Sequence, residues 1–327
     1  MEKYIVFGGN GFLGRYLVKA LLEDNKKVLV CDIKKSDLSI YDKSDFMKVD
    51  ITNKDDLKKI PYKKDDVVIN LAANQYHLKV PRKNREEFFF KVNYEGTRNI
   101  LLSMEEKKCF NFIYFSTDMT YGKPKYLPVD TRHQQEPFGP YGASKKASEK
   151  ICYEYRKKGF NITIFRPRMI LGPGRLGVLK KLFKLMEKNL PVPMIGNGSN
   201  CYQMISVFDC VTAILKCIEK NIPNKEYNLG SDNPPTVYDL LNKVIKEVNS
   251  KSVLIKTNGR ILKFILAGLG KIGIELLYKE QYEIADENYI LDIEETKKDL
   301  NWTPKYTDID MLYQAYEYYK QERVNEE

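Results

Sequence analysis

The stretch VFGGNGFLG, residues 6–14, joins a short apolar run to the start of a helical pattern. Its glycines Gly8, Gly11 and Gly14 lie where a first strand would end and a first helix would begin. Glycines there permit a tight turn and a close approach to a pyrophosphate, whose charge the free N–H groups of the helix attract. The spacing alone is weak evidence, but its strand–turn–helix context predicts a dinucleotide site. The residues expected to contact the dinucleotide here are Gly8, Asn10, Gly11, Phe12, Leu13 and Gly14.

Asp32 ends the next apolar run, KVLVCD, about twenty residues further along the chain. A carboxylate at that place accepts hydrogen bonds from the adenosine ribose and repels a 2′-phosphate, so it favours NAD over NADP. Lys34 and Lys35 could instead receive that phosphate, and Asp32 could simply be a solvated residue at a strand end. Both alternatives stay open at this point.

Further apolar runs follow, separated by helical patterns near residues 12–24, 88–107 and from 141 onward. Continuous rather than alternating apolar strands, separated by helices, indicate a parallel sheet covered on both faces. The fold class predicted is therefore α/β, a doubly wound parallel sheet with a smaller, mainly helical C-terminal lobe. We expect the dinucleotide-binding domain at residues 1–168, with 200–231 returning to the sheet, and the substrate lobe at 169–199 and 232–327.

Other strand ends supply further candidate contacts to the cofactor. Asp50 and Ile51 follow the third strand and are expected at the adenine edge. The small residues of NLAA would let the fourth strand pass close beneath the cofactor; these are Leu71, Ala72 and Ala73.

The composition narrows the class of protein. The 327 residues are 43% hydrophobic, and no apolar run approaches the roughly 20 residues of a membrane-spanning helix. The net charge is +10, but the basic residues alternate with acidic residues along the chain. This pattern indicates solvated faces rather than a nucleic-acid site, with attraction of an anionic substrate as the lesser alternative. Six cysteines without a C-x-x-C pair suit reduced core thiols of a cytoplasmic protein, and with two histidines a metal site is not expected.

A tyrosine followed four residues later by a lysine occurs at Tyr121, Tyr141, Tyr153 and Tyr316. Pro124 argues against a helix after Tyr121, whereas Tyr153 lies in later helical turns and Tyr316 in a polar tail helix. Tyr141 opens a helix directly after Pro140 and follows a strand end, where sites of this fold gather.

Tyr141 and Lys145 would share one helix face. The ammonium would lower the pKa of the phenol, so that Tyr141 takes a proton from an alcohol near neutral pH. Thr117, at the preceding strand end, would orient that alcohol, whose carbon passes a hydride to the nicotinamide.

Taken together, these segments resemble the extended short-chain dehydrogenase/reductase family, specifically its NAD-dependent sugar-nucleotide epimerase and dehydratase group. The resemblance spans nearly the whole chain and is carried by GGNGFLG, Asp32, VDIT, NLAA, VNYEGTRNI, STDMTYG, YGASK, RPRMILGPG, SVFDCVTAI and YNLGS. It implies a Rossmann fold, a retained NAD, and Thr117, Tyr141 and Lys145 as the catalytic hydroxyl, base and tuning lysine. It also implies a structural Asn93, Ser116 and Pro167 near the cofactor, and a homodimer formed through helices near 93–108 and 141–158.

Three departures from the family pattern concern the substrate. Met119 replaces the glutamate with which the family's dehydratases remove a proton, so 4,6-dehydration is not expected, although Asp118 is kept as a candidate sugar contact. Met169 replaces a common asparagine, and Tyr202 aligns with a phosphate-gripping arginine. Arg168 and Arg175 are the cations expected to replace that grip.

The sequence predicts an enzyme that oxidises a sugar hydroxyl, at carbon-4 of a nucleotide-linked sugar, as an epimerase or a dehydrogenase. An oxidoreductase of an apolar alcohol is the second interpretation, since the apolar segment 261–277 resembles the cap of the hydroxysteroid-dehydrogenase-like branch. That segment is otherwise an ordinary helix pair, a lid or an amphipathic membrane contact. A non-catalytic NAD-binding regulator is the third.

Overall fold

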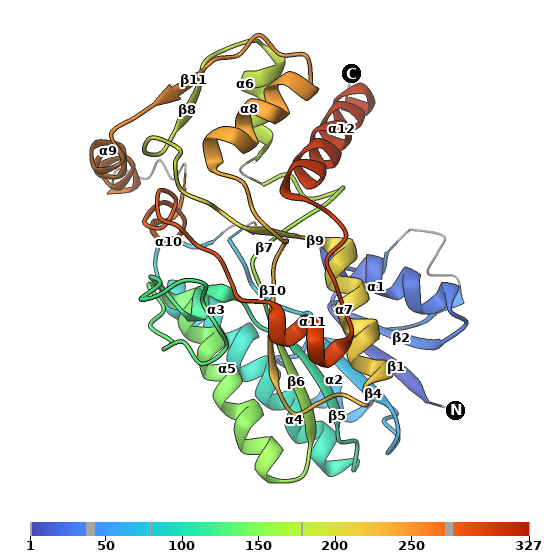
Figure 1. The fold of residues 1–327 in the computed structure, drawn as a ribbon. Coiled ribbons are helices and arrows are strands. Elements are labelled where there is room, and N and C mark those ends of the chain that lie inside the picture. Colours follow the sequence, from blue (N-terminus) through green and yellow to red (C-terminus); the bar gives the residue numbers. More distant parts are fainter. Residues whose placement is uncertain are drawn as a thin grey trace.

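The computed structural model describes residues 2–36, 43–76, 78, 80–177, 179–271 and 277–326. Among these residues, a seven-stranded parallel sheet runs through the centre in the order β10-β6-β5-β4-β1-β2-β3 (Figure 1). Its strands are β1 Lys3–Phe7, β2 Lys27–Asp32, β3 Asp45–Lys48, β4 Val67–Asn70, β5 Asn111–Phe115, β6 Asn161–Pro167 and β10 Glu226–Leu229. The predicted parallel sheet is confirmed, and β10 is the EYNL segment that returns to pair with β6.

Helices cover both faces of the sheet because neighbouring residues of each strand point to opposite sides. In β1, Val6 packs with α1 (Phe12–Glu23) and α7 (Val207–Glu219), whereas Phe7 packs on the other face. That second face is covered by α2 Lys54–Lys58, α4 Thr97–Glu106 and α5 Pro140–Lys157. The chain is therefore a doubly wound α/β protein, as its continuous apolar strands indicated.

A smaller lobe lies beyond one end of the sheet (Figure 1). Its core joins three helices, α6 Leu179–Glu187, α8 Val237–Glu247 and α12 Asp308–Glu326. Two short parallel strand pairs complete it, namely β7 Met169–Leu171 with β9 Met204–Ser206, and β8 Val192–Met194 with β11 Leu254–Lys256. Two further helices, α9 Gly259–Lys271 and α10 Lys279–Tyr282, lie at its edge.

The chain crosses between the two cores again near its C-terminus. Tyr289, Leu291 and Trp302 belong to the core beneath the sheet, together with α11 (Glu294–Leu300). The residue boundaries of the two lobes stay a prediction. The expected polar tail helix is present as α12, although it buries Tyr316 against Phe183 of α6.

Two short irregular helices lie close to the predicted site. The helix before α4 begins as α3 (Arg85–Phe90), passes through a π-helical turn η2 (Lys91–Gly96), and then continues as α4. A 3₁₀ turn, η3 (Asp118–Thr120), follows β5. No helix among the described residues is long and apolar enough to cross a membrane. Of the apolar segment 261–277, residues 272–276 lie outside the described residues.

Candidate active site

The glycine turn lies between β1 and α1, at the carboxyl edge of the sheet. Gly8 has a φ of +72° and lies against the end of β4, so that a Cβ atom there would lie 2.7 Å from the nitrogen of Ala72. A Cβ atom on Gly14 would lie 2.2 Å from the carbonyl oxygen of Gly8. Larger residues at these two positions would push the turn away from the sheet. Gly11 is the N-cap of α1 and provides no side-chain cap, which leaves the first N–H groups of the helix to other partners.

These residues fit a dinucleotide. The Asp32 carboxylate accepts a hydrogen bond of 3.0 Å from the Asn10 backbone N–H, which holds it at the mouth of the turn. The side-chain oxygen of Asn10 is buried and has no hydrogen-bond partner in the part of the chain that the structure describes. A narrow glycine cradle, an uncapped helix start and a carboxylate beside them match the pyrophosphate and ribose of NAD.

The residues expected around the cofactor at β4 and η2 lie close to one another. The Asn93 side chain accepts a hydrogen bond from the Asn74 N–H and donates to the Asn74 carbonyl and to the Ser144 hydroxyl, at 2.8, 3.1 and 3.0 Å. Asn93 thereby ties the loop after β4 to the first turn of α5. Ile51 contacts the same helix, where it packs on Gly96.

Other predicted cofactor residues face different neighbours. The Asp50 carboxylate accepts from the backbone N–H and hydroxyl of Thr52 and stays exposed. The Ser116 hydroxyl donates a hydrogen bond to the Glu149 carboxylate, and Pro167 is buried at the end of β6. Their contacts with NAD remain predictions.

Tyr141 lies in the first turn of α5 and is 6% exposed. Its ring packs edge-on against Tyr76 and Phe89, with centroids 5.5 and 5.6 Å away. Burial raises the pKa of Tyr141, while the positive charge of Arg175 and a hydrogen bond with Thr117 oppose that rise. The site thus brings together Tyr141 and Thr117, as expected.

Lys145 lies one turn further along α5 and is 2% exposed. Its ammonium donates a 2.6 Å hydrogen bond to the Phe115 carbonyl and lies 4.6 Å from the centre of the Tyr114 ring. Burial lowers the pKa of Lys145 to about 7, although the charge of Glu149 acts in the other direction. The positive charge of Arg175 acts to lower the pKa of Tyr141, and the tuning role expected of Lys145 stays a prediction.

A buried ion pair beneath the site was missed from the sequence. Arg166 of β6 donates to both carboxylate oxygens of Glu149, with the shortest distance 2.7 Å, and also to the hydroxyls of Tyr121 and Tyr153. No local spacing signals this contact, because Arg166 and Glu149 are 17 positions apart and lie on different elements. Two of the tyrosines set aside in the sequence therefore serve as partners of a buried arginine.

A second buried ion pair joins Arg168, just after β6, to Asp118. The guanidinium lies between the rings of Tyr202 and Tyr289, 4.4 and 4.1 Å from their centres. Burial alone would lower the pKa of Arg168, but the charge of Asp118 holds it raised. The Nη2 atom of Arg168 is buried without a hydrogen-bond partner among the described residues. The Asp118 carboxylate also accepts a 3.1 Å hydrogen bond from Thr117.

Arg175 and Met169 complete the predicted set. Arg175 donates a 2.6 Å hydrogen bond to the Gln75 side chain and lies 5.4 Å from the Phe12 ring centre, so it connects the glycine turn with the surroundings of Tyr141. Burial lowers its pKa. Met169 lies half-buried in β7 and packs against the core of the small lobe.

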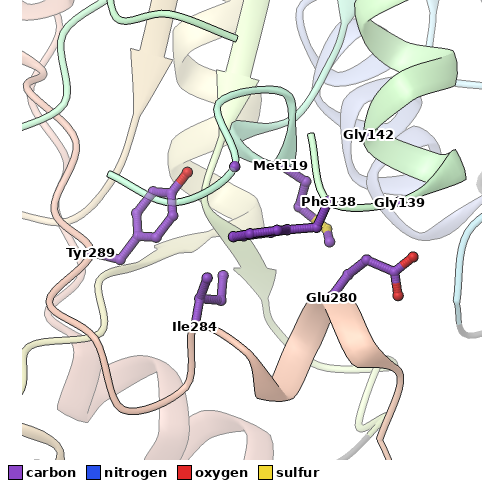
Figure 2. Close-up of a pocket in the computed structure, with 8 residues that line it drawn as sticks. Met119, Phe138, Gly139, Gly142, Glu280, Ile284 and Tyr289 are labelled. Atoms are coloured by element: carbon purple, nitrogen blue, oxygen red, sulfur yellow. The ribbon is translucent and has the colours of Figure 1, made fainter. Parts of the chain in front are cut away.

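A small pocket lies at the start of α5, where Gly139 and Gly142 form part of its lining (Figure 2). Met119, Phe138 and Ile284 supply its apolar wall. Glu280 of α10 projects toward Gly139, where a Cβ atom would lie 1.7 Å from a Glu280 carboxylate oxygen. Met119 thus shares this pocket with apolar side chains and with the Glu280 carboxylate. No group of acidic, histidine or cysteine side chains that could hold a metal ion occurs among the described residues.

Comparisons with known proteins agree with this geometry. The model of the NAD dependent epimerase/dehydratase family matches residues 4–230. An uncharacterized protein, y4nG, from Sinorhizobium fredii (strain NBRC 101917 / NGR234) is 30% identical over 325 residues, which cover 98% of this chain and 79% of that one. A protein named putative UDP-glucose 4-epimerase, from Methanocaldococcus jannaschii, is 30% identical over 260 residues, 77% of this chain and 84% of that one.

The fold is also similar to solved structures. The crystal structure of a UDP-glucose 4-epimerase from Thermotoga maritima, with UDP-glucose, superimposes with a TM-score of 0.78. The match covers 98% of this chain and 99% of that one at 23% sequence identity, so it shows a shared fold.

Proposed function

Because the chain belongs to the NAD-dependent epimerase/dehydratase family, we propose that it oxidises carbon-4 of a nucleotide-linked sugar and restores the hydroxyl with inverted configuration. The observation that carries this proposal is the buried Tyr141 beside Thr117, at the carboxyl edge of the sheet and close to the glycine turn. A phenol and a hydroxyl at that edge are placed to bind an alcohol and to move its proton. The names of the relatives support a sugar nucleotide as the substrate.

The chain's own residues divide the work of oxidation. The glycine turn, Asp32 and the start of α1 bind the cofactor, and bound NAD supplies the hydride acceptor. Thr117 orients the sugar hydroxyl, and Tyr141 takes its proton and later returns it. Arg175 lowers the pKa of Tyr141 in the direction that this step requires. Lys145 anchors the first turns of α5 to β5 through the Phe115 carbonyl.

Two features argue against dehydration. Met119 has no titratable group and cannot remove the proton that dehydration requires. Asp118 is held by Arg168 and accepts from Thr117, so its carboxylate serves as a fixed acceptor. Epimerisation needs only Tyr141 and a ketone that turns over within the site.

The unpartnered Nη2 of Arg168 and the guanidinium of Arg175 are the candidate substrate donors. The positive charge of Arg168 is neutralised by the Asp118 carboxylate. An N–H donor of such a neutral pair suits an uncharged sugar oxygen better than a diphosphate. Arg175 carries its charge beside Tyr141 and is the better candidate for a phosphate oxygen. We assign Tyr202 to the ring stack that holds Arg168.

The decisive experiment uses sugar nucleotides deuterated at carbon-4, in UDP, GDP, CDP and dTDP forms, with NMR and mass spectrometry of the products. An epimerase inverts carbon-4 and keeps the deuterium there. A net dehydrogenase releases the 4-ketone and accumulates NADH, while a dehydratase yields a product lighter by one water. Turnover of apolar secondary alcohols without any sugar nucleotide would favour the hydroxysteroid-like alternative. Bound NAD without turnover of any alcohol would favour a regulator.

The finer features of assembly belong to the same proposal. We propose that the homodimer contact is formed by α4 and α5, the helices that the family resemblance implicates. We also propose a cytoplasmic location, in keeping with six unpaired cysteines of which five are buried. Sedimentation velocity of the purified protein tests the first point. A monomer at micromolar concentration would contradict it.

A further inference from the structure

The outer face of β11 and α9 carries an exposed apolar patch. In the described part of the chain it consists of Val253 at 61% exposure, Ile255 at 44%, Ile261 at 60%, Phe264 at 80% and Ile265 at 49%. Ile261, Phe264 and Ile265 have i, i+3 and i+4 spacing and therefore share one side of the helix. Figure 1 shows α9 at the outer edge of the small lobe, next to β11.

The inner side of α9 is attached to the rest of the lobe. The Lys263 ammonium donates a 2.7 Å hydrogen bond to the Glu283 carbonyl and pairs with Asp286 at 2.5 Å. Leu266 on the same side is 8% exposed. The orientation of α9 is thus set by these contacts, and its apolar side faces outward. Large contiguous apolar patches on a folded surface mark contact with another molecule or a membrane.

The charges around the patch indicate what covers it. From Lys251 to Lys271 the sequence contains five basic residues and no acidic residue; one of the five, Lys263, is paired with Asp286, and the other four give this edge its positive charge. Arg260 is exposed directly before Ile261, whereas Lys256 follows Ile255 on the opposite face of the strand and lies 5.7 Å from the centre of the Tyr238 ring. A basic, apolar and exposed helix is the pattern of an interfacial helix, whose apolar side enters the acyl boundary while its cations meet anionic headgroups.

We propose that the β11–α9 face binds the surface of an anionic lipid bilayer. At 13 residues, α9 is about 20 Å long, which is shorter than the roughly 30 Å core of a bilayer, so it lies in the interface. A second copy of the chain fits this face less well. In a two-fold contact the same patch meets itself, and the cations of both copies would be brought together.

Vesicle co-sedimentation of the full-length protein tests the proposal. We expect binding to vesicles of equal parts phosphatidylcholine and phosphatidylglycerol, weak binding to phosphatidylcholine alone, and release by salt. Phe264→Ser should weaken binding at least about tenfold, because it removes the most exposed apolar anchor. Arg260→Gln should weaken it roughly fivefold. Tyr313→Ser, at an exposed aromatic residue of α12 in the same lobe, is the matched control and should bind as wild type.

Insertion depth is measured with Phe264→Trp and brominated lipids. The natural Trp302 is 3% exposed and serves as the unquenched reference, whereas a tryptophan at position 264 should be quenched. Turnover of a soluble substrate should be unchanged in all these variants. Equal binding of wild type and Phe264→Ser, or no binding to anionic vesicles, would overturn the proposal. A change from dimer to monomer in Phe264→Ser, without vesicle binding by wild type, would assign the face to a second copy.

Discussion

At the scale of single residues, the proposed chemistry depends on the Tyr141 hydroxyl. Tyr141→Phe keeps the buried ring and its contacts with Tyr76 and Phe89, but it removes the group that takes the proton. We expect turnover to fall by about 10²-fold or more, with little change in NAD binding. Tyr316→Phe is the control, since Tyr316 is equally buried in the small lobe. Full activity of Tyr141→Phe in steady-state assays would refute the assignment.

Arg175 is expected to set the pH dependence of that step. Its positive charge lowers the pKa of Tyr141, and the reaction requires the deprotonated phenol. Arg175→Gln should therefore move the rising limb of the pH–kcat profile to higher pH, and turnover at pH 7 should fall. Arg175→Lys keeps the charge and should restore much of the wild-type profile. A rise in KM for the sugar nucleotide with an unchanged profile would instead assign Arg175 to phosphate binding alone.

Arg168 and Asp118 are expected to behave as one unit. Arg168→Gln leaves the Asp118 carboxylate buried without its partner, which costs roughly 3–5 kcal/mol of stability. Adding Asp118→Asn should recover most of that loss in a thermal melt. If Arg168 also donates to the sugar through Nη2, KM stays raised in the stable double variant. A double variant with wild-type KM would limit Arg168 to a structural role.

The individual residues also show what the sequence can predict. The sequence predicts Gly8, Asp32, Tyr141 and Thr117 as site residues because chemistry demands those types at strand ends, and the structure brings Tyr141 and Thr117 together. The buried ion pair of Arg166 and Glu149 was not predicted, because these residues are 17 positions apart and meet only when α5 packs on β6. A cation spaced one helical turn from Tyr141 suggested Lys145 as the tuning group. The structure adds Arg175, whose positive charge acts to lower the pKa of Tyr141, and the role of Lys145 stays a prediction.

At the scale of elements, α10 is held to the start of α5 by one close approach. Gly139, the N-cap of α5, lies under the Glu280 carboxylate, which is 8% exposed and faces the positive end of the helix dipole. Gly139→Ala should displace this carboxylate, because the added Cβ atom would lie 1.7 Å from its oxygen. We expect a loss of about 0.3–1 kcal/mol in a denaturant melt, because the end of a flexible side chain moves aside and mainly its contact with the helix dipole is lost.

A double-mutant cycle separates this contact from a local effect on the helix. In a Glu280→Ala background the oxygen is gone, so Gly139→Ala should become nearly neutral. The backbone at Gly139 has φ −153°, which alanine adopts without strain. Additive losses in the two single variants would show that the close approach is not what destabilises the protein.

At the scale of the whole molecule, the strand order was predictable and the division of the chain was less so. Apolar runs separated by helices define the doubly wound sheet, but short strands such as β7 and β9 carry too few residues for a periodic pattern. The polar composition of α12 concealed Tyr316 and Tyr319, which are buried only because α6 and α8 lie against them. Burial of that kind depends on partners distant in sequence.

Repeated crossings between the two lobes should make unfolding one transition. Trp302 is the single tryptophan of the chain and belongs to the core beneath the sheet, whereas α12 follows it directly and packs in the small lobe. We expect the Trp302 fluorescence melt and the far-UV circular dichroism melt to coincide, and NAD to raise both midpoints together. Separate midpoints for the two probes would show lobes that unfold independently.

The buried pair of Arg168 and Asp118 has a consequence for how such an enzyme diverges from its relatives. A single substitution at either position leaves a buried charge without its partner. This costs a large part of the free energy of unfolding, which is typically about 5–15 kcal/mol. Exchanging the pair for another one therefore requires two changes, and the intermediate with one change is poorly folded. We expect lineages to inherit Arg168 and Asp118 together or to lose them together, so the pair is a marker by which descendants with the same substrate preference can be grouped.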